Sequence, residues 1–485
     1  MPDSISNSAL WGHLPHPYRA QRQGTGYTPV MNPSNLSSIA DLVIHPEWIV
    51  PVVPRGQVLT NHCVVVTDGC ISGILPSDEG RRIQAIEHLN LPSQVLLPGL
   101  VNAHGHSAMT LLRGIADDAP LLTWLEDHIW PLEAAFVSET FVRDGTDLAL
   151  LELVMGGTTT FSDMYFFPDV TAQRIDLAGL RAQLVFPVLD VATAWATDSE
   201  ACLKKGLALR DEYRDHALIQ VGIGAHSTYS VPETTLRRIA TLLHELDAPL
   251  QIHLHETEAE IAGAMDTHGE RPISFLNRLG LLGPRTQCVH MTSLTDEDID
   301  LLRSSNSHVI HCPRSNMKLA SGVSPVDRLL KAGVNVALGT DGAASNNRLS
   351  MLGELQMAAL LAKLESLEAT ALSATAALEV ATLGGARALG LEATVGSIET
   401  GKAADLIALD LSQPHSQPLN NIVSQIVYAS NGTELTHSWV AGQPLVRDGK
   451  PLTLAPAEIS ARVARWPEKF KAHQASIDPT GNYLS

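Results

Sequence analysis

Cysteine is scarce in this chain of 485 residues, and its five cysteines never form a Cys-x-x-Cys pair. The sequence therefore indicates neither a disulfide framework nor a four-cysteine zinc site. Apolar runs are too short for the roughly 18 residues that cross a bilayer, and the N-terminal residues lack the apolar core of a signal peptide. These absences favour a reduced compartment, and we expect a cytoplasmic protein.

Positive charge is also in deficit. Lys and Arg number 33 against 52 Asp and Glu, a formal net charge of −19. Because this excess repels nucleic acid and anionic membranes, we expect neither as a partner. The net charge is compatible with a small neutral or zwitterionic substrate and with assembly into a homo-oligomer. The hydrophobic fraction of 45% is ample for a large core.

Changes in composition along the chain predict four parts. Residues 1–37 are rich in small and polar residues without a period, which is typical of a flexible tail. Residues 38–94 and 392–455 share short β-branched runs separated by turn residues, and we expect them to build one small β-sandwich domain. Residues 95–391 alternate apolar runs with helical patterns, which predicts a (β/α)8 barrel of TIM type. Residues 456–485 form a C-terminal extension.

Apolar runs in the central region are the candidate barrel strands. These runs cover residues 96–101, 158–163, 182–188, 218–225, 250–255, 287–290, 308–311 and 335–339. The active-site residues of such barrels lie at the carboxyl ends of the strands. Polar residues that end these runs are therefore candidate site residues.

Histidines and carboxylates stand at these ends far more often than a solvated surface explains. They are His104 and His106 after the first run, Asp163, His226, the group His253, His255 and Glu256, then His290, His311 and Asp341. Residues two apart on an extended chain project to the same side. The His-x-His pair after the first run can thus offer both imidazoles to one ion.

Spacing excludes several other sites. The pair His255-Glu256 is followed by TEA, so the second histidine of a His-Glu-x-x-His protease helix is missing. A cytidine-type zinc deaminase needs Pro-Cys-x-x-Cys, whereas this chain has only HCPRS at 311–315. The run GIGAHS lacks the third glycine of a dinucleotide fingerprint, and no Walker lysine motif occurs.

Taken together, LPGLVNAHGHSAMTLLRG, QIHLHETEAE, CVHMT and LGTDGAASNN resemble the amidohydrolase superfamily. Within it, the chain is similar to the 5-methylthioadenosine/S-adenosylhomocysteine deaminases, from about residue 40 to GKAADLIALD at 401–410. This resemblance implies metal ligands at His104, His106, His253 and Asp341. It also implies an acid/base at Glu256, with His290 and Asp341 holding the attacking water.

The resemblance extends to the substrate. It implies that Glu133 takes the ribose hydroxyls, that His226 contacts the purine and that Trp124 lies in the segment lining the pocket, with Glu256 and Asp341 also facing the substrate. The stretch between the first strand and its helix is long, acidic and aromatic. Loops of this size at a barrel mouth usually bind something.

Three imidazoles and one carboxylate with an open position suit zinc, although Fe²⁺ or Mn²⁺ also accept nitrogen and oxygen ligands. Two-metal amidohydrolases use a lysine after strand four, where GIGAHSTYS carries His226 instead. We therefore expect one Zn²⁺ per chain. The implied activity is hydrolytic deamination of 5′-methylthioadenosine, S-adenosylhomocysteine or both to the inosine analogue and ammonia, with a purine nucleoside as the small-molecule partner.

Some assignments stay open at this point. His255 is in phase with His253 on an ideal strand and could replace it, although the family pattern favours His253. Glu256 could support a ligand instead of moving protons. Asp163 is a hydrogen-bond acceptor or a cap, and His311 has no derived role. Alternative functions are deamination or dechlorination of guanine, a cytosine-like base or a triazine, or a metal-free scaffold.

Overall fold

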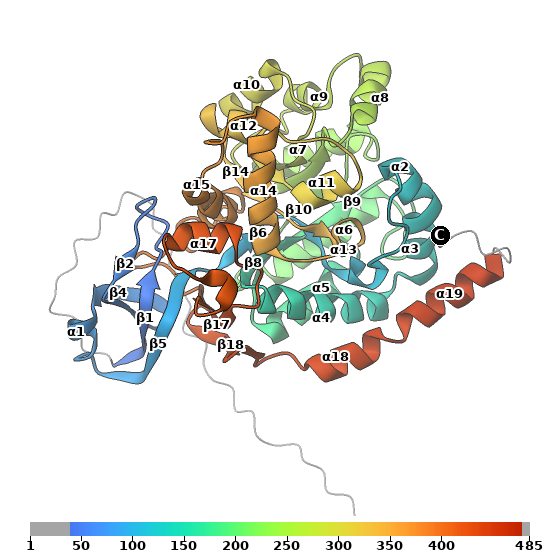
Figure 1. The fold of residues 1–485 in the computed structure, drawn as a ribbon. Helices are drawn as coiled ribbons and strands as arrows, with labels where there is room; N and C mark the ends of the chain where they lie inside the picture. The colour runs from blue at the N-terminus through green and yellow to red at the C-terminus, as the bar shows by residue number, and fades with distance from the viewer. Residues whose placement is uncertain (1–38, 478–485) are drawn as a thin grey trace, which may run out of the picture. The chain divides into compact units, whose positions relative to one another are not determined.

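The computed structural model describes residues 39–477, so the tail expected at 1–37 lies outside the described residues. An eight-stranded sheet forms the centre of the fold (Figure 1). Its strands are β6 (Leu100–Asn102), β8 (Thr158–Asp163), β9 (Arg181–Val188), β10 (Ile219–Ala225), β11 (Leu250–Leu254), β12 (Thr286–His290), β13 (His308–His311) and β14 (Val336–Leu338). Each pairs in parallel with the next, which confirms the predicted barrel.

The barrel closes where its first and last strands meet. The Ala103 N–H donates to the Leu338 carbonyl at 2.8 Å. Immediately beyond, the short strands β7 (Gly105–His106) and β15 (Asp341–Gly342) pair in parallel. The closure thus brings His106 beside Asp341, although 235 positions of sequence numbering separate them.

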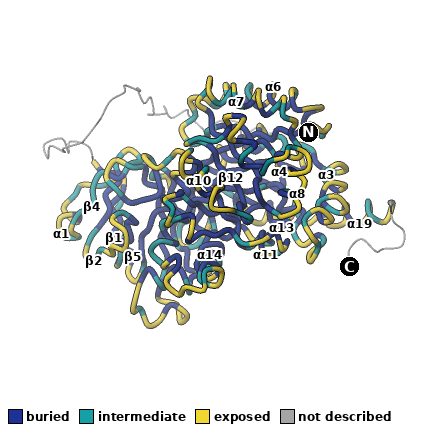
Figure 2. The backbone as a smooth tube through the Cα atoms, turned by 90° about the horizontal axis from the view of Figure 1, so that it is seen from above, coloured by how far each residue is buried: buried dark blue, intermediate teal, exposed yellow. Residues whose placement is uncertain are grey.

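Helices surround the barrel and bury its outer face (Figures 1 and 2). They are α4 (Glu139–Met155), α5 (Pro168–Ala178), α6 (Ser199–Glu212), α7 (Glu233–Leu246), α8 (Glu258–His268), α9 (Pro272–Arg278), α10 (Asp296–Ser305), α11 (Pro313–Lys318), α12 (Val326–Lys331), α13 (Ala343–Asn346), α14 (Met351–Ser366), α15 (Ala374–Glu379), η4 (Val380–Gly384) and α16 (Gly385–Ala388). A capping box formed by Thr295 and Asp298 begins α10.

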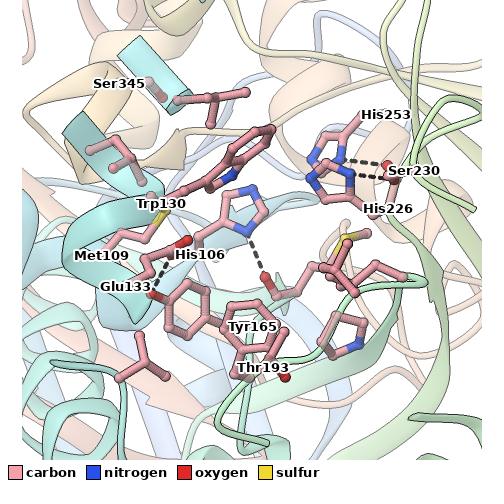
Figure 3. Close-up of a pocket in the computed structure, with 18 of the residues that line it drawn as sticks. His106, Met109, Trp130, Glu133, Tyr165, Thr193, His226, Ser230, His253 and Ser345 are labelled. Carbon is pink, nitrogen blue, oxygen red and sulfur yellow. Dashed lines mark hydrogen bonds between the residues drawn. The ribbon is translucent and has the colours of Figure 1, made fainter. Parts of the chain in front are cut away.

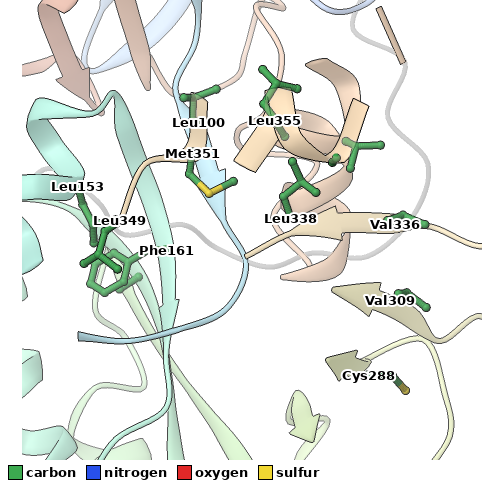
Figure 4. Packing of buried hydrophobic residues seen from close by; sticks show 14 of the residues in the cluster. Leu100, Leu153, Phe161, Cys288, Val309, Val336, Leu338, Leu349, Met351 and Leu355 are labelled. Atoms are coloured by element: carbon green, nitrogen blue, oxygen red, sulfur yellow. The ribbon is translucent and has the colours of Figure 1, made fainter. Parts of the chain in front are cut away.

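The main core lies between the strands and these helices. Figure 4 shows Phe161 of β8 close to Leu153 of α4, and Leu338 of β14 close to Leu355 of α14. Each buried aliphatic or aromatic side chain contributes about 1.5–3 kcal/mol relative to an exposed one. Strands held in this way give the loops at their carboxyl ends a rigid base.

A second, nine-stranded sheet is built from both ends of the described chain. Its strands are β1 (Ala40–Ile49), β2 (Leu59–Thr60), β3 (His62–Thr67), β4 (Cys70–Pro76), β5 (Ala85–Pro98), β16 (Leu406–Asp410), β17 (Leu435–Val440), β18 (Gln443–Arg447) and β19 (Lys450–Pro451). Because β5 pairs with β1 on one side and with β16 on the other, the prediction of a sheet-rich domain from both ends is confirmed.

The chain passes between the two sheets at Gly99. Residues 96–98, predicted as the start of the first barrel strand, belong to β5 instead. A Cβ at Gly99 would lie 1.9 Å from Thr159 Oγ1, so only glycine permits this close approach. An apolar run of sequence cannot reveal that it serves two sheets in turn.

A buried ion pair joins the sheets at the opposite end of the barrel. Arg181, the first residue of β9, donates to both carboxylate oxygens of Asp405 at 2.8 and 3.1 Å. Asp405 lies just before β16, and both side chains are almost fully buried. This bidentate geometry is the stronger kind of charge-assisted hydrogen bonding.

The remaining helices lie in the connections and near the C-terminus. They are α1 (Ser77–Gly80), η2 (Ser107–Leu112), α2 (Leu121–Thr123), η3 (Trp124–Ile129), α3 (Trp130–Phe136), η5 (Pro414–Ser416), α17 (Ile422–Tyr428), α18 (Pro456–Val463) and α19 (Trp466–Ile477). Among residues 39–477, no helix has both the length and the apolar character needed to cross a bilayer.

Candidate active site

Four side chains from three strand ends meet near the barrel closure. His104 Nε2 lies 3.2 Å from His253 Nε2 and 3.4 Å from Asp341 Oδ1, and His106 Nε2 lies 3.2 Å from the same oxygen. Ligands about 2.1 Å from a tetrahedral zinc lie roughly 3.4 Å from one another. These three separations fit neighbouring ligands of one ion, and His104 is shared by the two candidate metal groups, His104–His106–Asp341 and His104–His253–His290.

The hydrogen bonds on the far side of the three imidazoles fix which nitrogen carries the proton. The Nδ1 contacts are His104 to Gln251 Oε1 at 2.7 Å, His106 to the Met164 carbonyl at 2.5 Å and His253 to the His226 carbonyl at 2.8 Å. Each acceptor is an oxygen without a proton, so each Nδ1 donates. All three Nε2 atoms then face the shared centre, as metal-binding imidazoles require. Burial lowers the pKa of His106, but its hydrogen bond to Asp341 outweighs burial and raises this pKa to about 9, so a metal here would take the place of a proton on His106 Nε2.

Asp341 is held as an anion. Its Oδ2 accepts from the Ser315 hydroxyl at 2.6 Å and from the Ser345 hydroxyl at 3.1 Å. Burial alone raises the pKa of this carboxyl, but hydrogen bonding and charge from His104 and His106 outweigh burial, so the pKa lies well below its usual range. The chain thus supplies one negative charge to the centre.

Burial lowers the pKa of His104 and, more strongly, that of His253. These two side chains are therefore neutral, which is the form of imidazole that binds metal.

The backbone of Asp341 adopts a φ of +60° and that of His290 a φ of +76°. Such left-handed conformations cost on the order of 1–3 kcal/mol and concentrate at functional sites.

His290 lies near the same centre, within metal-binding distance of His104 and His253. Its hydrogen bonding differs, however. Asn316 Nδ2 donates to His290 Nδ1 at 3.0 Å, so the proton of this imidazole is on Nε2, which points toward Glu256 Oε2 at 3.6 Å. His290 is thus built as a donor into the cavity, which leaves it no lone pair there.

Glu256 follows β11 and is buried beside Asp341. Burial and then the charge of Asp341 raise the pKa of Glu256 to about 8. The neighbouring carboxylate of Glu260 accepts from the backbone N–H groups of Glu256 at 2.7 Å and His255 at 3.1 Å, which holds this turn in place. A carboxyl group that changes protonation near neutral pH is suited to general acid/base work.

His255 faces away from this centre. Its Nδ1 donates to the Ser293 carbonyl at 2.9 Å, and its Nε2 accepts from the Ile273 N–H at 3.1 Å. Both nitrogens are therefore occupied in fixing the start of α9. The strand β11 ends at Leu254, and the φ of +52° at His255 breaks the alternation that put it in phase with His253.

A cavity of about 390 Å³ opens above these side chains (Figure 3). At its inner end lie His106, His226, His253, Glu256, His290 and Asp341. Its outer part is lined mainly by apolar side chains: Leu121, Trp124, Leu125, Ile129, Trp130, Val137, Phe166, Leu189 and Val191. The cavity thus offers polar chemistry at one end and apolar contact at the other.

Glu133 of α3 reaches this cavity and accepts a hydrogen bond from the Tyr165 hydroxyl at 2.6 Å (Figure 3). Burial raises its pKa to about 7, although the Tyr165 hydrogen bond acts in the opposite direction. Trp124 is buried in the cavity wall, whereas Trp130 is 41% exposed. A carboxylate beside aromatic surface is suited to a ligand with hydroxyl groups and a flat ring.

His226 lies beside His253 on the other side of the cavity (Figure 3). Its Nδ1 is 2.8 Å from the Ser230 hydroxyl. Burial and then the charges of His106 and His104 lower the pKa of His226 to about 4, so it is neutral near pH 7. It can therefore donate or accept a hydrogen bond toward a ligand without adding charge.

Several of the residues that support the site were not predicted. Gln251 lies two residues before His253 on the same strand and projects to the same side, a signal that the sequence does contain. Asn316, Ser315, Ser345 and Tyr165 follow strand ends or lie in short helices, where no sequence pattern marks them. Their roles depend on neighbours distant in sequence.

The contacts of Asp163 explain its role, whereas those of His311 do not. Asp163 Oδ1 accepts from the Ser107 N–H at 2.5 Å, so this carboxylate holds the turn that follows His106. His311 is buried at the end of β13, and its Nδ1 has no hydrogen-bond partner among residues 39–477. No role for His311 follows from its contacts.

Comparison with known proteins agrees with this geometry. The amidohydrolase family profile matches residues 95–445, and the chain belongs to this family. A 5-methylthioadenosine/S-adenosylhomocysteine deaminase of Teredinibacter turnerae is 50% identical over 433 residues, covering 89% of this chain and 98% of its own. A protein of the same name from Saccharophagus degradans is 47% identical, covering 90% of this chain and 98% of its own.

Solved structures give the same fold. An adenosine deaminase from Xanthomonas campestris, solved with bound zinc, is 43% identical with a TM-score of 0.88, and the match covers 89% of this chain and 99% of that one. An atrazine chlorohydrolase from Arthrobacter aurescens has a TM-score of 0.82 over 88% of this chain and 99% of its own. At 21% identity it shares the fold alone.

Proposed function

We propose that this protein is a hydrolytic deaminase of 5′-methylthioadenosine and S-adenosylhomocysteine, which it converts to the inosine analogue and ammonia. The observation that carries the proposal is that three imidazole Nε2 atoms and Asp341 converge beside Glu256, whose pKa is raised, below a cavity that Glu133 lines. Relatives at 50% and 47% identity bear the same name. Guanine or triazine chemistry, and a scaffold role, are not favoured.

The metal would be held by His104, His106, His253 and Asp341, which offer three imidazoles and one carboxylate around His104. We propose one Zn²⁺ per chain, because these ligands suit zinc and the Xanthomonas campestris enzyme carries it. When bound, a divalent cation here supplies a water whose pKa falls from 15.7 to about 7. Fe²⁺ and Mn²⁺ accept the same kinds of ligand.

The proton transfers belong to Glu256. Its carboxylate takes a proton from the water as the oxygen adds to purine C6, and gives it to the ring nitrogen. Glu256 then moves the remaining proton of the C6 hydroxyl to the exocyclic nitrogen, the C6–N bond breaks, ammonia leaves and a C6 carbonyl forms. His290 donates from Nε2, and Asp341 accepts from the water, so that the attacking oxygen keeps its direction.

The nucleoside is the small-molecule partner. Glu133 can accept from both ribose hydroxyls when ionised, and charge-assisted hydrogen bonds of this kind are strong and directional. The neutral His226 contacts the purine, and Trp124 covers the apolar part of the ligand. The enclosed cavity keeps bulk water from the reacting carbon.

The test is to incubate the purified protein with 5′-methylthioadenosine and to follow both ammonia release and the ultraviolet change from adenine to hypoxanthine. We expect equal amounts of ammonia and inosine analogue, with activity lost after chelation and restored by Zn²⁺. Guanine, cytosine and atrazine serve as comparison substrates. Conversion of one of these alone, without turnover of the thioether nucleoside, would contradict the proposal.

A further inference from the structure

The C-terminal helices α18 and α19 lie along α4 and reach the region of α3 (Figure 1). Most side chains of α19 are exposed, but Trp466 and Phe470 are each only 4% exposed. Residues four apart lie on one face of a helix. The helix therefore presents a narrow aromatic stripe to the body of the protein.

One end of this stripe is fixed to α4. Trp466 Nε1 donates to Asp144 Oδ2 at 3.2 Å, and the indole packs edge-on against Phe141 with the ring centres 5.2 Å apart. Arg462 of α18 forms an ion pair with Asp144 at 3.3 Å. Because α4 packs directly on the barrel, the start of α19 has a rigid support.

The stripe also contacts α3, the helix that carries Glu133. Phe136, the last residue of α3, lies with its ring centre 5.0 Å from that of Phe470 and 6.3 Å from that of Trp466. Glu133 is three residues earlier on the same short helix. The two α19 aromatics also belong to the apolar cluster that contains Trp124.

The position of segment 113–137 depends mainly on its packing against other parts of the protein. Its helices α2, η3 and α3 follow one another without a break over residues 121–136, and the middle part, η3, has the wide turns of a π-helix. The connection before them includes left-handed backbone at Ala116 and Asp118. Most of the stability of a helix in a protein comes from tertiary packing, so the position of Glu133 depends on what lies behind α3.

We propose that α19 is a positioning element for the substrate-binding segment, acting through Trp466 and Phe470. The aromatic stripe transfers the rigidity of α4 to α3 and so keeps Glu133 in place for the ligand. The link from the position of Glu133 to substrate affinity rests on the proposed function. Trp466 and Phe470 themselves touch neither substrate nor the reacting atoms.

The experiment compares four variants of the full chain. Trp466→Ala and Phe470→Ala remove the stripe, Phe470→Leu keeps an apolar side chain there, and Lys471→Ala changes an exposed residue on the same helix. Readouts are kcat and KM for 5′-methylthioadenosine, metal content, and hydrogen exchange of the backbone amides of residues 121–137.

We expect the two aromatic-to-alanine variants to raise KM by about ten- to a hundredfold with kcat and metal content close to those of the unchanged protein. Exchange in 121–137 should accelerate while that of the barrel strands does not. Phe470→Leu should recover most of the loss, and Lys471→Ala should match the unchanged protein.

Unchanged KM together with unchanged exchange in 121–137 would overturn the positioning role. So would a uniform loss of exchange protection across the barrel in Phe470→Leu, because it would indicate a general structural role. If the unchanged protein converts no nucleoside at all, the proposed function fails, yet the exchange measurement still decides whether α19 holds the segment.

Discussion

The inner end of the cavity and its mouth are built in different ways. The inner end consists of His104, His106, His253, His290 and Asp341, and each of these side chains forms a hydrogen bond with a neighbouring residue. The mouth, segment 113–137, is held mainly by the packing of its apolar side chains against other parts of the protein. The difference teaches that the two functions of the cavity, reaction and recognition, can be disturbed separately.

Parallel strands explain the rigidity of the inner end. Each barrel strand has hydrogen-bonded neighbours, and the site residues lie within a few positions of strand ends. Changes there should therefore alter metal binding and kcat. Changes in the mouth should alter KM, because that segment contributes contacts that are made equally in the bound state and the transition state.

The largest effect is expected from removing a metal ligand. His104→Ala and Asp341→Ala each delete one of four donors, and we expect both metal and turnover to fall to background. Elemental analysis and the deamination assay measure these. His244→Ala, at an exposed histidine of α7, is the matched control and should retain both. Full activity in either ligand variant would refute that ligand, and two metal equivalents at these strand ends would refute a mononuclear site.

Glu256→Gln should lower kcat by at least about 10²–10⁴-fold, because the amide has nearly the same shape but cannot carry the proton. Metal content should be unchanged. The control is Glu258→Gln, two residues later at an exposed position. If Glu256→Gln lost metal in proportion to activity, the carboxylate would be a support for the ligands and would not be the proton carrier.

Gln251→Leu should weaken metal binding by about 10–100-fold, because it removes the acceptor that fixes the His104 tautomer. A titration with a competing chelator measures the affinity. The matched change, Gln220→Leu, lies on the neighbouring strand β10, where the side chain donates to the Leu389 carbonyl away from the ligands. Equal metal affinity in the Gln251→Leu and Gln220→Leu variants would show that Gln251 does not support metal binding by His104.

Much of this architecture could be predicted, because buried parallel strands leave a strong pattern. The apolar runs and the polar residues at their ends indicated the barrel and the inner end of the cavity. The requirement for glycine at position 99 could not be predicted in this way, because it arises from close contact with Thr159, which is distant in sequence. The same holds for His255, which the left-handed turn after β11 directs toward α9.

Supporting residues were harder to predict for the same physical reason. Asn316, Ser315 and Tyr165 have their roles because of the side chains that they contact in the folded protein. Those partners are distant in sequence, so no sequence spacing indicates the contacts. The extension 456–485 offered no motif. Only the structure shows that Trp466 and Phe470 turn inward from an otherwise exposed helix.

The most direct test of the central claim is kcat/KM for 5′-methylthioadenosine, adenosine and adenine, measured with the unchanged protein and with Glu133→Gln. Adenine has no ribose, and each charge-assisted hydrogen bond that it loses contributes about 1.5–3 kcal/mol. The account predicts the thioether nucleoside first, adenosine second and adenine lower by about 10²-fold or more, with Glu133→Gln narrowing that gap at constant metal content. Equal kcat/KM for adenine and 5′-methylthioadenosine, or turnover of guanine alone, would contradict it.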